Sequence, residues 1–137
     1  MVYISINVLA IMFATLAGLG AGLTYCLVFD RAGSTLRTAS RARKWKLALV
    51  AFLAQLWLAS ILAGALILAP AEADAWIMAL GSAIVIWIGF VAPVIVVTHC
   101  YREVALRTAV VDCIRWLVVM AVQATVLFSI GLQPPPT

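Results

Sequence analysis

The chain has 137 residues, of which 66% are hydrophobic and 10% are charged, and its mean hydropathy is +1.18. A soluble domain is about half apolar and about a quarter charged, so this chain has too few polar side chains to cover a water-facing surface. The composition excludes an ordinary soluble protein and predicts an integral membrane protein. The formal net charge of +4 suggests an anionic membrane or a nucleic acid as partner, and the placement of the basic residues decides between them.

Four apolar segments follow one another, over about residues 2–29, 47–69, 76–98 and 110–132. Each reaches or exceeds the roughly 20 residues that a helix needs to cross the hydrocarbon core. The first is too long, and lacks the basic start, for a cleaved signal peptide. The short connections leave no room for an extramembrane domain. We therefore expect one integral membrane domain over residues 1–137, with an all-α fold in which four transmembrane helices form an antiparallel bundle.

The basic residues lie in two of the three connections. They are Arg31, Arg37, Arg41, Arg43, Lys44 and Lys46 in the first, Arg102 and Arg107 in the third, and Arg115 just beyond it. By the positive-inside rule these connections are cytoplasmic and both termini lie outside the cytoplasm. Because topology explains the charges, we expect no nucleic acid partner, and the basic segment "RTASRARKWK" suits anionic membrane lipids. This pattern predicts a multi-pass protein of the bacterial inner (plasma) membrane.

Small residues at a spacing of four mark a helix-packing surface. They are Ala10, Ala14, Gly18 and Gly22 in the first predicted helix, and Ala59 and Ala63 in the second. In lipid, helices associate through close backbone approach rather than through a hydrophobic gain, and small side chains permit that approach. The surface predicts packing inside one chain, and the alternative is self-association between chains.

The segment "WIGFVAP" carries two helix breakers in the third predicted helix. Pro93 has no N–H for the carbonyl of Gly89, and its ring crowds that carbonyl. Glycine at that place lets a neighbouring helix, a hydroxyl or a water reach the freed oxygen. We expect a kink that is either a packing bend or a hinge and pocket lining with Trp87 and Phe90. The indoles of Trp57 and Trp87, near mid-span, need a partner such as another helix's carbonyl, or supply packing volume.

A polar cluster lies at the level of the basic connections. Its members are Asp30, His99, Arg102, Glu103, Asp112 and Arg115, accompanied by Cys26, Cys100 and Cys113. Glu103 with Arg107, and Asp112 with Arg115, have the spacing of pairs on a helix surface. The alternative interpretation joins Asp112 to His99 or Arg102 across the hairpin of the third and fourth helices. The cysteines and the histidine lack zinc-ligand spacing, so we expect no metal.

No ionisable residue lies at the centre of a predicted span, and no nucleophile stands beside a base. Proton-coupled transport and catalysis both need such groups. We therefore expect no catalytic residues, no cofactor and no enzyme activity.

The segments "WIGFVAP" and "THCYREVALRTAVVDCIRW" resemble the bacterial integral membrane family called domain of unknown function 1761. Its Trp-(Leu/Ile)-Gly-Phe pattern is matched by residues 87–90, and its aromatic turn and aliphatic-Asp step by Tyr101, Val111 and Asp112. The segment "TYCLVFD" departs from the family pattern because it lacks a proline. The resemblance implies a membrane protein with four helices, and the family has no assigned activity to carry over.

We expect a small membrane protein that acts through helix contacts, by self-association or as an accessory subunit of another membrane protein. The alternative is a passive channel or small-molecule carrier lined by Trp87, Gly89, Pro93 and the polar cluster. Four short helices enclose little volume, so the alternative needs an oligomer.

Overall fold

The computed structural model describes residues 2–29, 38–68 and 74–134, with side chains from residue 4 onward. These residues form helices and no strand: α1 (Val2–Ile6), α2 (Val8–Phe29), α4 (Arg41–Ile67), α5 (Ala75–Ile86), the π-helical turn η1 (Trp87–Val91), α6 (Ala92–Tyr101) and α7 (Leu106–Ile130). Four spans are long and apolar enough to cross a membrane: Val8–Phe29, Arg41–Ile67, Ala75–Tyr101 and Leu106–Ile130. The all-α class with four spanning helices is confirmed, and the protein is a multi-pass membrane protein.

The observed helix bounds differ from the predicted ones at three places. The first helix is interrupted at Asn7, between α1 and α2. The second begins at Arg41 rather than at residue 47, because the Ser40 hydroxyl accepts the Arg43 N–H and caps the N-terminus. The third and fourth predicted helices are joined by a tight turn in which Glu103 has a φ of 53°. Because the second helix begins at Arg41, several basic residues of the first predicted connection lie on α4.

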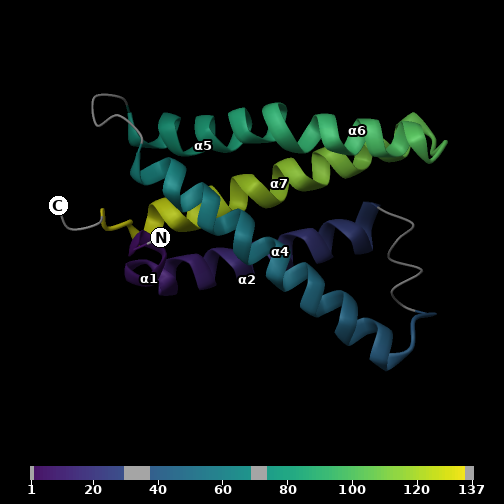
Figure 1. Cartoon of the computed structure of the whole chain (residues 1–137), viewed down its shortest axis with the longest axis horizontal. Coiled ribbons are helices and arrows are strands. Elements are labelled where there is room, and N and C mark those ends of the chain that lie inside the picture. The colour runs from purple at the N-terminus through teal and green to yellow at the C-terminus, as the bar shows by residue number, and fades with distance from the viewer. Residues whose placement is uncertain (1, 30–37, 69–73, 135–137) are drawn as a thin grey trace.

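Helix α7 lies in the middle of the bundle (Figure 1). It packs along α2 on one side and along α5, η1 and α6 on the other, while α4 crosses obliquely and contacts α2, α5 and α7. The N-terminal half of α4 diverges from the other helices, and the first buried side chain of α4 is that of Gln55. The basic start of α4 therefore lies away from the bundle.

The core is built mostly from small side chains. Its members are Ala10, Ile11 and Ala14 of α2, Ala59, Leu62 and Ala63 of α4, Ala83 of α5, and Met120, Ala124 and Leu127 of α7. Many large aliphatic and aromatic side chains of the same helices face outward instead. This arrangement suits a protein surrounded by lipid, where small residues bring helix backbones together and large apolar ones meet acyl chains.

Candidate functional site

The predicted small-residue surface of α2 faces two helices of the same chain. Ala14 and Gly18 are buried, and Gly22 is half-buried. A Cβ at Gly18 would lie 2.7 Å from Gln123 Nε2 and 2.9 Å from Gln55 Oε1, and one at Gly22 would lie 3.2 Å from a Val119 methyl group. The surface thus meets α4 and α7 together, and on α4 both Ala59 and Ala63 are fully buried.

A pair of buried glutamines joins α4 to α7 beside Gly18. Gln123 Nε2 donates to Gln55 Oε1 at 2.7 Å and to the Gln55 carbonyl at 3.3 Å. Gln123 is fully buried, and its Oε1 has no hydrogen-bond partner among the residues that the structure describes. The sequence reasoning missed this pair. The available signal was a glutamine in each of two apolar spans, since a polar side chain in lipid is expected to face another helix.

Where the sequence predicts a kink, the structure has the π-helical turn η1. The Ala92 N–H bonds to the Trp87 carbonyl, five residues earlier, directly before Pro93 near the start of α6. A π turn is one of the recognised ways in which a helix changes direction. Trp87 Nε1–H donates to the Cys113 carbonyl of α7 at 2.8 Å. The Trp87 indole therefore uses another helix's carbonyl, one of the two predicted alternatives.

Gly89 and Phe90 face away from the bundle, whereas Val91 of the same turn packs against the core. A Cβ at Gly89 would meet no atom within 4 Å, and Phe90 is 71% exposed. Both positions face outward from the described helices, because η1 presents its Trp87 side to α7 and its other side outward. Trp57 is 61% exposed, so it supplies no packing volume to the core.

The polar cluster connects three helices through side-chain contacts. His99 Nε2 of α6 lies 3.1 Å from Asp112 Oδ2 of α7. Arg115 Nη2 lies 3.1 Å from Asp112 Oδ1, and Arg115 Nη1 donates to Cys26 Sγ of α2 at 3.1 Å. The cross-hairpin pairing and the pairing along α7 are therefore both present. We call His99, Asp112, Arg115 and Cys26 the hairpin cluster.

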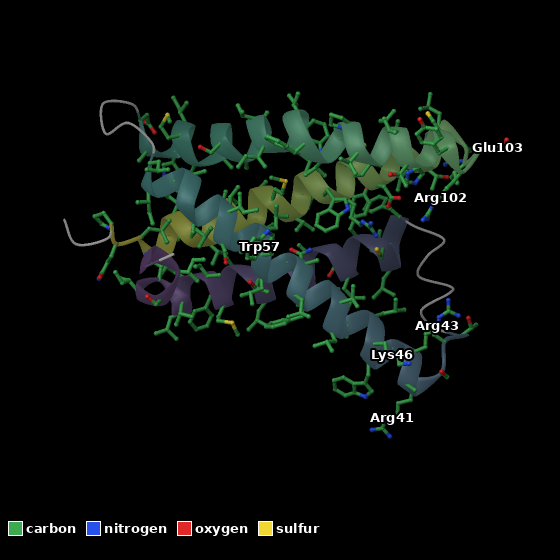
Figure 2. All side chains as sticks on the ribbon, in the orientation of Figure 1. Arg41, Arg43, Lys46, Trp57, Arg102 and Glu103 are labelled. Atoms are coloured by element: carbon green, nitrogen blue, oxygen red, sulfur yellow. The ribbon has the colours of Figure 1, made fainter. Side chains whose placement is uncertain are left out.

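The other predicted members of the cluster stand apart from it. Arg102 and Glu103 are exposed in the turn between α6 and α7 (Figure 2). The prediction that Glu103 pairs with Arg107 across a helical turn is wrong, because Glu103 has a left-handed φ and precedes the start of α7. Asp30 lies outside the described residues. Within residues 2–29, 38–68 and 74–134, no three side chains of His, Cys, Asp or Glu are placed to hold a metal ion.

A second polar contact closes the opposite end of the bundle. Asn7 Nδ2 donates to the Gln133 carbonyl at 2.9 Å, and the Gln133 N–H donates to Asn7 Oδ1 at 2.8 Å. Asn7 is buried. One side chain between α1 and α2 thus engages both backbone groups of a residue that follows α7. The sequence reasoning did not anticipate this contact.

A family model described as "Protein of unknown function (DUF1761)" matches residues 9–128. The chain belongs to the DUF1761 family. The match runs from α2 into α7 and includes the π turn and the hairpin cluster, which confirms the resemblance noted in "WIGFVAP" and the segment after it. No curated protein and no solved structure matches the chain. The DUF1761 description assigns no activity.

Proposed function

We propose that this DUF1761 protein acts through helix contacts as a homo-oligomer, with the third span as its contact surface. One observation carries the proposal. In the most apolar 18-residue stretch of the third span only 6% is buried inside the bundle, against 28–33% in the corresponding stretches of the other three spans. Ala79 and Ala83 are the buried residues of α5, and η1 and α6 have none. The proposal assigns the chain no catalysis and no cofactor.

Two glycines explain why a helix, rather than lipid alone, suits this surface. A Cβ at Gly81 or at Gly89 would meet no atom within 4 Å, so the backbone of the third span is open to the outside at both. Glycine offers acyl chains no side chain to pack against, but it lets a second helix approach closely. A second copy of the chain presents the same surface, and a two-fold pairing would bury both at once.

Native mass spectrometry of protein extracted in mild detergent tests the proposal. We expect a dimer or higher oligomer that is lost in the Gly89→Leu variant, because the added side chain blocks close approach. Gly20→Leu is the matched control, since Gly20 also has nothing within 4 Å but lies on α2. A chain of different mass that is lost in the same variant would favour an accessory subunit. A monomer in every sample, or oligomers that persist unchanged in Gly89→Leu, would refute the proposal that the third span is the contact surface.

We also propose that the basic end of the bundle lies in the cytoplasm of a bacterial cell, in its inner membrane. Arg41, Arg43, Lys46 and Arg102 lie at the same end of the structure (Figure 2), and this asymmetry supports the proposal. In a Cys100→Ser background, cysteines introduced at Asp74 and at Glu103 can be probed with a membrane-impermeant maleimide on intact cells. We expect labelling at the first position and protection at the second, and the reverse pattern would overturn the orientation.

A passive channel or small-molecule carrier is the second candidate. Gly89 faces outward and is exposed, as is Pro93, so any passage that they line would run between chains. Flux of small solutes through liposomes, abolished by Gly89→Leu and unaffected by Gly20→Leu, would favour this candidate over a purely structural oligomer.

A further inference from the structure

The geometry around His99 points to a proton-binding site: we propose that one proton, shared by His99 and Asp112, closes α6 onto α7, and that its loss as pH rises opens this end of the hairpin. The inference does not depend on the contact surface of the third span.

His99 Nδ1 lies 2.8 Å from the Ile95 carbonyl oxygen on its own helix. A carbonyl oxygen only accepts hydrogen bonds, so Nδ1 must carry a hydrogen for this contact to be a bond. In a neutral imidazole, which has one N–H, the other nitrogen is then a bare acceptor.

The other ring nitrogen, His99 Nε2, lies 3.1 Å from Asp112 Oδ2. An ionised carboxylate also only accepts. A neutral ring with its hydrogen on Nδ1 would therefore place one lone pair against another. Moving the hydrogen to Nε2 would create the same conflict at Ile95. Both contacts are hydrogen bonds only when an additional proton sits between Nε2 and Oδ2, carried by either atom.

The surrounding charges show what this proton must balance. On α7, Arg115 binds the second oxygen of Asp112, and the same guanidinium contacts the Cys26 thiol of α2. The carboxylate favours the added proton and the guanidinium opposes it, so the protonated cluster carries one net positive charge. Further titratable or charged groups lie close in sequence: Cys100 and Tyr101 follow His99, Arg102 and Glu103 are exposed in the turn, and Cys113 is buried on α7.

The proton has a mechanical consequence because α6 packs along α7 without a buried side chain of its own. Neither η1 nor α6 has a buried side chain, and the Trp87 indole attaches to α7 before α6 begins. The side chains of His99 and Asp112 are 18% and 20% exposed and lie beside the exposed turn at Arg102 and Glu103, from which a proton can arrive. The closed state binds one more proton than an open state with a neutral ring. Raising the pH therefore favours opening.

The protein is suited to a direct test because His99 is its one histidine. Nitrogen-15 NMR of histidine-labelled protein in nanodiscs reports the protonation of both ring nitrogens without overlap. Hydrogen exchange over residues 99–109, expressed as protection factors, reports opening. We expect the loss of the shared proton to coincide with a fall in protection of roughly ten- to hundredfold, the effect of losing one hydrogen bond to a charged group.

The Asp112→Asn variant distinguishes loss of the shared proton from simple loss of packing. Its amide can donate to Nε2 of a neutral ring while Nδ1–H still donates to Ile95, so protection should no longer depend on pH. Asp74→Asn, at the far end of the third span, is the matched control and should keep the wild-type pH dependence. Two results would overturn the proposal: a neutral ring with undiminished protection in the wild type, or the same pH dependence in Asp112→Asn. If that variant fails to fold, the wild-type comparison alone decides.

Discussion

Adding one methyl group at Gly18 should weaken the bundle, because that position lies against the glutamine pair. The new Cβ would lie 2.7 Å from Gln123 Nε2, 2.9 Å from Gln55 Oε1 and 3.0 Å from Gln123 Cγ. Contacts this short force the side chains to move, and Gln123 is fully buried, with no exposed side on which to yield. Overpacking costs about 1–3 kcal/mol, and a lost interhelical hydrogen bond in a membrane costs about 0.6 kcal/mol. Alanine regains up to about 1 kcal/mol of helix propensity.

The expected net loss for Gly18→Ala is therefore about 1–3 kcal/mol of unfolding free energy. Titration of detergent-solubilised protein with SDS, followed by circular dichroism, measures it. Gly20→Ala is the matched control, since nothing lies within 4 Å of a Cβ there, and it should be neutral or slightly stabilising. Shortening the partner with Gln123→Ala should remove most of the Gly18→Ala penalty in a double-mutant cycle. Equal stability of the two alanine variants would refute the argument.

Three further predictions concern the other polar contacts. Asp112→Ala removes the anion that links α6 to α7 and should lower the unfolding free energy by about 1–2 kcal/mol, since its pairs are partly exposed; an unchanged SDS transition would contradict this. Trp87→Phe keeps the aromatic volume but loses the indole bond to the backbone of α7 and should cost about 0.5–1.5 kcal/mol, whereas Trp57→Phe, on the outer surface, should cost nothing measurable in the same titration. Asn7→Ala removes both hydrogen bonds to Gln133, and hydrogen exchange of the Gln133 amide should then accelerate at least about tenfold. Exchange as slow as in the wild type would show that the contact does not hold the backbone there.

The four spans could be predicted from hydropathy because the thickness of the hydrocarbon core sets a minimum length of apolar sequence. Their ends were less predictable. The start of α4 depends on the Ser40 cap, and the cap lies inside a charged segment where hydropathy carries no signal. Which face of a span turns inward is also hard to read when both faces are apolar. The small-residue spacing identified that face on α2, but its contact with α7 as well as α4 follows from the three-dimensional arrangement.

The candidate site was predictable only in part. Pairing of Asp112 with His99 was one of several alternatives, and the sharp turn at Glu103 brings the end of α6 back beside the start of α7. Gln55 and Gln123 lie in spans that are distant in the chain, so no sequence spacing links them. Their contact depends on the crossing of α4 over α7 and on the space that Gly18 leaves.

The contact between Asn7 and Gln133 bears on how the protein is made. The two residues are 126 positions apart, so a ribosome completes the second partner long after the first span has entered the bilayer. Until then Asn7 lacks its contact with Gln133, and Gln55 likewise awaits Gln123. Neither contact can form before α7 has been made, so the last span to be synthesised completes the polar contacts of the bundle.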